Sequence, residues 1–90
     1  MWVYTQARKV DGRMFLLDLT HLGVIAINGP FEVDGEHMWT IEASDGTTTW
    51  ILAEANNLTD AAAIQRKIFN CLAIGEKALN LNSMKRHPSD

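Results

Sequence analysis

One pair of side chains has residue types and a spacing that could support acid–base chemistry. Asp18 and His21 lie three residues apart in a polar interruption between two apolar segments. A histidine–carboxylate pair can act as an acid–base couple or orient a ligand. The simpler interpretation is that Asp18 and Thr20 satisfy backbone groups in a turn while His21 is solvated. We favour it because polar residues are expected at a turn.

A second group of candidate ligands, His37, Glu42 and Glu54, lies on or near a predicted β-hairpin. A metal site needs three or four ligands that converge on one point. In the hairpin register predicted below, Glu54 lies opposite His37, whereas Glu42 lies opposite Thr49. We therefore expect a His37–Glu54 surface ion pair of small energetic value rather than a metal site.

Cys71 is the single cysteine, which rules out an internal disulfide. A nucleophilic cysteine needs an activated thiolate and a neighbouring base, and the adjacent Asn70 and Leu72 provide neither. We expect Cys71 to be a buried structural residue. No glycine-rich phosphate loop, CxxC pair or nucleophile elbow is present. The sequence thus predicts no catalytic, metal-binding or cofactor-binding residues and a protein that is not an enzyme.

The rest of the chain is organised around a predicted β-hairpin that runs from His37 to Ala55. Asp45-Gly46 predicts a two-residue type I′ turn, because both central positions of that turn need a positive φ. This turn pairs Ile41 with Trp50. Because side chains alternate along a strand, the register places four large residues on one apolar face: Trp39, Ile41, Trp50 and Leu52.

Four shorter segments before the hairpin have the composition of strands, namely residues 2–7, 13–17, 22–27 and 31–33. Asp11-Gly12 and Asp34-Gly35 are turn signals between them. Pro30 marks a break, because proline cannot donate to a strand ladder. Three Asp-Gly pairs in a short chain are consistent with an antiparallel meander.

From Leu58 the apolar residues change to a spacing of three and four, which is typical of an amphipathic helix. Asn57 or Thr59 can cap its N-terminus. The helix either ends at Gly75 or continues through Ala78. Its apolar stripe consists of Ala61, Ile64, Ile68, Cys71, Leu72 and Gly75. The predicted fold is therefore α+β, an antiparallel sheet of about five strands in a meander packed against one C-terminal α-helix.

Length and composition predict one folded domain at residues 1–79, followed by a flexible tail at residues 80–90. The net charge of −3 disfavours nucleic acid as a partner, because phosphate binding needs clustered Lys and Arg. The N-terminus lacks a basic region followed by an apolar run, and no apolar run approaches the length of a membrane span. We therefore expect a cytoplasmic protein without membrane contact.

The aromatic residues are more numerous than one sheet–helix interface needs, and the helix is apolar around more than half its circumference. Either the core is larger than this fold implies, or some of these side chains form a subunit or partner interface, where aromatic residues are enriched. The candidate interface residues are Trp2, Tyr4, Phe69 and Ile74. The strand that begins at Trp2 could also pair with its mate across a two-fold axis, so we expect a homo-oligomer such as a dimer.

Three segments resemble a pattern found in short uncharacterised proteins of bacteria and their phages. Such proteins begin with a strand and a turn, continue with an x-Leu-Asp-x-Val-x-x-Ile segment and a β-hairpin, and close with a helix rich in Ala, Ile and Leu. The corresponding segments here are Leu17–Leu22, Met38–Ala55 and Asp60–Leu72. The order of elements is also loosely similar to reduced pleckstrin-homology-like folds. These resemblances imply a small accessory protein of a phage or mobile element and supply no catalytic residue.

The expected function is that of a non-catalytic binding protein that occupies a surface on a host or phage protein. The specific hypothesis is an anti-CRISPR inhibitor of a bacterial defence system. Acidic side chains would then contact a basic groove of the target by charge complementarity. The candidates are Asp18, Glu32, Asp34, Glu36, Glu42, Asp45 and Glu54.

Two alternatives remain open. In the first, the protein binds or sequesters a nucleotide at an oligomer interface, with bases stacked on Trp2, Tyr4 or Trp39 and phosphates held by Arg8, Lys9 or Arg13. In the second, it is a structural subunit of a larger assembly, in which the wide apolar surface of the helix packs against repeated copies.

Overall fold

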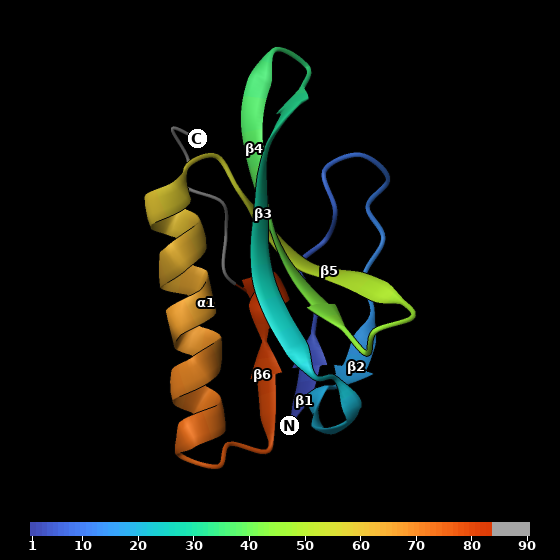
Figure 1. Cartoon of the computed structure of the whole chain (residues 1–90), viewed down its shortest axis with the longest axis vertical. Coiled ribbons are helices and arrows are strands. Elements are labelled where there is room, and N and C mark those ends of the chain that lie inside the picture. Colours follow the sequence, from blue (N-terminus) through green and yellow to red (C-terminus); the bar gives the residue numbers. More distant parts are fainter. Residues whose placement is uncertain (84–90) are drawn as a thin grey trace.

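Six strands form two three-stranded sheets, and one long helix packs against them (Figure 1). The computed structural model describes residues 1–83. The first sheet has the order β2-β1-β6 and the second the order β3-β4-β5. In chain order the elements are β1 (Trp2–Tyr4), β2 (Leu16–Asp18), the 3-10 helix η1 (Leu19–His21), β3 (Val24–Val33), β4 (Glu36–Ser44), β5 (Thr49–Ala55), α1 (Leu58–Ala73), β6 (Ala78–Asn80) and the 3-10 helix η2 (Leu81–Ser83).

The α+β class and the C-terminal helix are confirmed, but the prediction of about five strands in one meander is wrong. The polar interruption after β2 separates the two sheets, because Asp18 accepts a hydrogen bond from the Thr20 N–H (3.0 Å) and begins the 3-10 helix η1. The chain then enters β3 in the other sheet. The first sheet is completed by β6, which pairs parallel to β1, while β2 pairs antiparallel to it.

The described fold continues beyond residue 79, the predicted end of the domain. Asn80 pairs with Tyr4 at the end of β6. Leu81 is completely buried, and the backbone N–H of Ala7 donates to Asn82 Oδ1 (3.3 Å). Residues 80–83 of the predicted tail therefore belong to the fold, and residues 84–90 lie outside the described part of the chain.

The β3–β4 hairpin contains the two-residue turn that an Asp-Gly pair favours. Val33 pairs with Glu36, and both intervening residues have a positive φ, 52° at Asp34 and 78° at Gly35. This is the geometry of a type I′ turn. The strand before it differs from the prediction, because β3 continues through the Asn28-Gly29-Pro30 segment with a local shift of register instead of breaking there.

The β4–β5 hairpin has a longer loop than predicted. Ser44 pairs with Thr49, because the Asp45 carboxylate accepts hydrogen bonds from the N–H groups of Thr47 (2.9 Å) and Thr48 (2.8 Å) and holds a four-residue loop. These bonds also lower the pKa of Asp45 from its ordinary value. The predicted two-residue turn at Asp45-Gly46 is therefore wrong.

This longer loop changes the pairing along the whole hairpin. Trp50 lies opposite Ala43 instead of opposite Ile41. A further shift of register between Ile41 and Glu42 makes Ala53 the partner of Ile41. Ile41 and Leu52 remain fully buried, as the predicted apolar face required, whereas Trp39 and Trp50 are only half-buried.

The helix α1 begins and ends at local signals. Asn57 Oδ1 accepts from the Asp60 N–H (2.8 Å), and the Asn57 side-chain amide donates back to the Asp60 carboxylate (3.1 Å). At the other end, Gly75 has a φ of 78°, and the N–H groups of Gly75 and Glu76 donate to the Leu72 and Cys71 carbonyls. This pair of bonds is a Schellman motif, so the helix ends before Gly75 and does not continue through Ala78.

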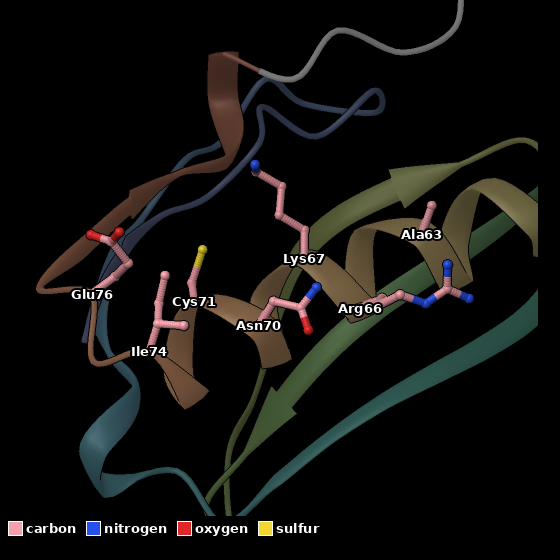
Figure 2. Close-up of a pocket in the computed structure, with 7 residues that line it drawn as sticks. All are labelled: Ala63, Arg66, Lys67, Asn70, Cys71, Ile74 and Glu76. Atoms are coloured by element: carbon pink, nitrogen blue, oxygen red, sulfur yellow. The ribbon is translucent and has the colours of Figure 1, made fainter.

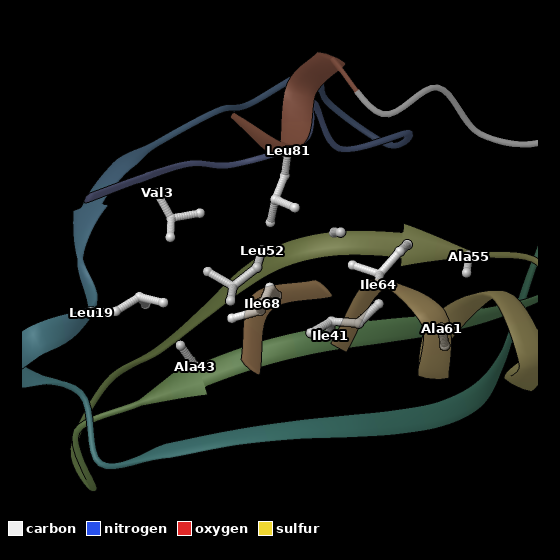
Figure 3. Packing of buried hydrophobic residues seen from close by; sticks show 11 residues of the cluster. Val3, Leu19, Ile41, Ala43, Leu52, Ala55, Ala61, Ile64, Ile68 and Leu81 are labelled. Atoms are coloured by element: carbon white, nitrogen blue, oxygen red, sulfur yellow. The ribbon is translucent and has the colours of Figure 1, made fainter. Parts of the chain in front are cut away.

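The hydrophobic core lies between the inner faces of the two sheets and the buried stripe of α1 (Figure 3). The helix contributes Ala61, Ile64 and Ile68. Of the other residues predicted to lie on the same stripe, Cys71 is half-buried and Leu72 is exposed. The other elements contribute Val3, Leu19, Ile41, Ala43, Leu52, Ala53, Ala55 and Leu81. Residues from both ends of the described chain therefore meet in one core.

Replacement of Gly29 by alanine should destabilise the fold. The φ of Gly29 is 141°, and a Cβ there would lie 2.9 Å from the Met38 carbonyl oxygen and 3.0 Å from the Trp39 ring. We expect Gly29→Ala to lower the free energy of unfolding by roughly 1–3 kcal/mol, as measured by urea denaturation. Gly23→Ala is the matched control, because a Cβ at Gly23 meets nothing within 4 Å. Equal stability of the two variants would contradict this packing of Gly29.

Candidate functional site

The outer face of the β2-β1-β6 sheet presents large apolar side chains to solvent. Trp2 and Tyr4 lie on the central strand with Val3 between them, and Val3 is completely buried on the opposite side. Trp2 is 50% exposed and Tyr4 41% exposed. Leu16, which pairs with Tyr4 across β1 and β2, is 64% exposed. These three neighbouring side chains form a continuous apolar surface, which we call the outer face.

The polar residues at the margins of the outer face are bonded within the chain. Asp18 pairs with Trp2 and accepts from the Thr20 N–H, while the Asn80 side chain accepts from the Asn82 N–H (2.9 Å). The remaining position of the sheet beside Trp2 is Ala78, a small apolar residue. The centre of the outer face therefore carries no charge, as in the fully buried part of many protein interfaces.

The four residues predicted to form an interface lie on three different surfaces. Trp2 and Tyr4 share the outer face. Phe69 follows Gln65 by one helical turn, and Gln65 donates its side-chain amide to the Ile25 carbonyl, so Phe69 lies on the β3 side of α1. Ile74 caps the C-terminus of α1 and lines a groove on the other side of the helix (Figure 2). The structure thus places Phe69 and Ile74 away from the Trp2–Tyr4 pair.

Three of the predicted acidic contact residues gather at the tip of the β3–β4 hairpin. Glu32, Asp34 and Glu36 are exposed there, and the hairpin projects beyond the other elements (Figure 1). We call residues 31–37 the hairpin tip. The Glu36 carboxylate is bound by the Lys9 ammonium group (2.7 Å), which ties the hairpin tip to the β1–β2 connection. Glu32 and Asp34 form none of the ion pairs found within residues 1–83.

The other acidic candidates are separated from the hairpin tip. Glu54 is only 8% exposed and accepts the Lys9 N–H (2.7 Å), so its carboxylate is not available to a partner, contrary to the prediction. Glu42 accepts from the Thr40 hydroxyl (2.5 Å) and the Asn28 amide (2.8 Å). Asp18 lies in the other sheet, and Asp45 belongs to the β4–β5 loop. Apart from the buried Glu54, the predicted acidic residues are therefore divided among four places, namely the hairpin tip, Glu42, Asp18 and Asp45.

The structure does not bring the candidate metal ligands together. His37 pairs with Glu32 and Glu54 with Thr40, so the predicted His37–Glu54 ion pair is wrong, because it depended on the shorter β4–β5 loop. Among residues 1–83, no group of three or more His, Cys, Asp and Glu side chains is placed to hold a metal ion. Cys71 carries a free thiol and is half-buried rather than buried.

The Asp18–His21 pair has the geometry of a turn. Asp18 begins η1, and its carboxylate lies 3.9 Å from His21 Nε2 and 3.8 Å from the terminal amino group. Hydrogen bonds from the Thr20 side chain and backbone lower the pKa of Asp18 from its ordinary value of 3.8. His21 is exposed. The carboxylate is thus held by backbone and terminal groups, as the simpler interpretation of the sequence proposes.

The groups suggested for nucleotide binding are dispersed. Arg8 and Arg13 both lie close to the Asp11 carboxylate (3.5 and 3.9 Å), while Lys9 is bound to Glu36. Trp39 belongs to the second sheet and packs against the core, so it does not share a surface with Trp2 and Tyr4. The described chain therefore offers no common site for a stacked base and a phosphate built from these residues.

A shallow groove of about 510 Å³ runs along the outer side of α1 (Figure 2). Arg66 and Lys67 provide its cationic groups, and the remaining lining residues are Ala63, Asn70, Cys71, Ile74 and Glu76. We call it the helix groove. Arg66, Lys67 and Leu16 are not among the residues that the sequence predicts to be functional. The sequence signal for Arg66 and Lys67 is that two cations are adjacent on the polar side of the helix. The signal for Leu16 is weaker, because the strand segment at residues 13–17 is apolar on both faces.

No known family model matches this chain, and no curated protein or solved structure is significantly similar to it. Within the described residues, no helix is both long enough and apolar enough to cross a membrane.

The stability that Asp18 contributes should depend on pH. Its pKa is lowered in the folded chain, so its contribution is fully present above the unfolded value and is lost as the pH falls through the folded value. We expect Asp18→Ala to be less stable than the parent at about pH 7, and the difference to shrink by about pH 2 in thermal unfolding experiments. Asp18→Asn keeps the acceptor for the Thr20 N–H without the charge and should lack this pH-dependent step. A difference between the parent and Asp18→Ala that stays constant with pH would contradict the assignment.

Proposed function

We propose that this protein is a non-catalytic binding protein that acts through protein–protein contacts, with the outer face as its contact surface. The observation that supports this proposal is the clustering of Trp2, Tyr4 and Leu16, all exposed, on one side of a sheet whose other side is buried. A folded domain has no structural need to leave two aromatic rings on its surface. Such patches mark interaction sites in many soluble proteins.

The size of the outer face fits the centre of an interface. A fully buried aromatic side chain covers about 150–250 Å², so the exposed parts of the three side chains present on the order of 300 Å² of apolar surface. A standard interface buries about 800 Å² on each partner. The outer face would therefore form the water-excluded middle, and polar residues around it would form the rim.

Our proposal for the class of partner is supported by the sequence rather than by the fold. We propose a protein of phage or mobile-element type that binds a host protein, with inhibition of a bacterial defence system in the manner of an anti-CRISPR protein as the specific form. The small size, the net charge of −3 and the segmental resemblance described above support this form. It also requires no catalytic residue.

The outer face can be tested by removing its aromatic rings. We expect Trp2→Ala with Tyr4→Ala to reduce partner binding at least tenfold, because truncating central aromatic residues costs about 2 kcal/mol or more. The measurement is affinity capture from a bacterial lysate, quantified by mass spectrometry and repeated with purified partner. Val10→Ala is the matched control, since Val10 is exposed but lies outside the outer face.

The same variants can be tested for inhibition of a defence system. Phage plaque counts on CRISPR-immune bacteria should rise when the parent protein or Val10→Ala is expressed, and should stay low with the double variant. Partners captured equally by all three proteins would overturn the assignment of the outer face. Parent protein that leaves immunity intact across the main CRISPR types would overturn the anti-CRISPR form of the proposal.

A further inference from the structure

The helix groove contains two cations that form no ion pair within the described chain. Arg66 and Lys67 are both exposed. The ion pairs within residues 1–83 use Arg8, Lys9 and Arg13 as their side-chain cations besides His21, and none involves Arg66 or Lys67. The chain as a whole has a net charge of −3. Glu76 also lines the helix groove, so its two cations and one carboxylate leave it with a formal charge of +1. The helix groove is thus a local region of opposite sign to the whole chain, which favours an anionic occupant.

The hairpin tip has the complementary charge. Glu32 and Asp34 are exposed at its end, where the chain reverses through the type I′ turn. The Lys9–Glu36 bridge fixes the tip to the β1–β2 connection. An ordered tip loses little conformational freedom when it binds. Its projection beyond the rest of the molecule makes it accessible to another copy (Figure 1).

We propose that the helix groove of one copy of this chain binds the hairpin tip of a second copy. Glu32 and Asp34 would lie against Arg66 and Lys67. The lining residues on the helix run from Ala63 to Ile74. They span about 16 Å of helix axis, which is long enough for one end of a hairpin.

The occupant is a second copy rather than the same chain. The hairpin tip is the continuation of the β3–β4 ladder, which is paired on both sides of the register shift between Asn28 and Phe31 and therefore cannot fold back over α1. The contact joins two different surfaces, so it is heterologous, and a dimer keeps one free tip on one copy and one free groove on the other. Association should therefore continue past the dimer as concentration rises. This inference does not depend on the proposed function, because it uses neither Trp2 nor Tyr4.

The test measures self-association by sedimentation velocity of the whole chain at low and high ionic strength. We expect the average mass to rise with concentration in about 20 mM salt and to fall toward the monomer in about 500 mM salt, because exposed charges are screened. Arg66→Glu with Lys67→Glu should weaken association at least tenfold. Glu32→Lys with Asp34→Asn should do the same, and asparagine is chosen at position 34 because it tolerates the positive φ of 52° there.

The decisive sample is an equimolar mixture of the tip variant and the groove variant. Glu32→Lys with Asp34→Asn keeps the groove intact, and Arg66→Glu with Lys67→Glu keeps the tip intact, so each variant supplies the surface that the other lacks. The mixture should regain association that neither variant shows alone. Lys77→Glu is the matched control, since Lys77 is an exposed cation outside the helix groove and should associate like the parent.

Three results would overturn the inference. The first is a parent protein that stays monomeric at low salt. The second is self-association that persists in Arg66→Glu with Lys67→Glu. The third is a mixture of the two variants that does not associate although both variants keep the parent's circular dichroism spectrum. Association that is lost only in Trp2→Ala with Tyr4→Ala would instead place self-contact at the outer face. That result would exclude the helix groove as the site of self-association, and it would agree with the proposal that the outer face is a protein contact surface.

Discussion

The arrangement of the two sheets depends on the hydrogen bonds of one buried residue, Gln6. Its backbone N–H donates to the Leu52 carbonyl (2.8 Å), and its side-chain oxygen accepts from the Glu54 N–H (2.9 Å). Gln6 thus satisfies two backbone groups at the edge of β5 at the point where the chain leaves β1. An unpaired buried backbone group costs about 1–3 kcal/mol, so this junction holds the chain that follows β1 against β5.

The same junction explains why charge is distributed unevenly over the surface. The Glu54 carboxylate is buried and holds the Lys9 backbone, and the Lys9 ammonium group reaches Glu36 on the hairpin. These charged groups stabilise the fold by linking the β1–β2 connection to β5 and to the β3–β4 hairpin. Among the exposed groups, the apolar outer face lies on β1 and β2, the cations Arg66 and Lys67 lie on α1, and the carboxylates of Glu32 and Asp34 lie at the hairpin tip. A small domain can in this way offer three chemically different surfaces.

The sequence predicts those parts of the fold that depend on neighbouring residues. The change of apolar spacing predicts α1, and the structure uses one of its two predicted caps, Asn57, and the earlier of its two predicted ends, at Gly75, because each of these signals acts within a few residues. Two of the three Asp-Gly pairs show the limit of such signals. Asp34-Gly35 forms the expected turn, whereas Asp45 bonds to Thr47 and Thr48 and lengthens its loop.

Elements that exist only through distant pairing could not be predicted. Residues 78–80 form a strand because β1 lies beside them, and nothing in Ala-Leu-Asn signals it. The outer face was predicted only in part, because it too depends on how distant strands pair. Excess aromatic residues indicated Trp2 and Tyr4, but Leu16 lies in a segment that is apolar on both faces, so only the sheet decides which side chains stay exposed. The sequence also could not show that Phe69 and Ile74 lie on other surfaces than Trp2 and Tyr4, because this depends on where α1 packs in the fold.

The parallel pairing of β1 with β6 has a consequence for the order of folding. The two strands lie near opposite ends of the described chain, so nearly all of it must be synthesised before β1 acquires its second neighbour. Contacts of this sequence separation form late, because closing a long loop has an entropic cost that local hairpins and helices avoid. During translation β1 can pair only with β2. We expect the surface that carries Trp2 and Tyr4 to acquire its final shape in the last step of folding, after the helix has formed.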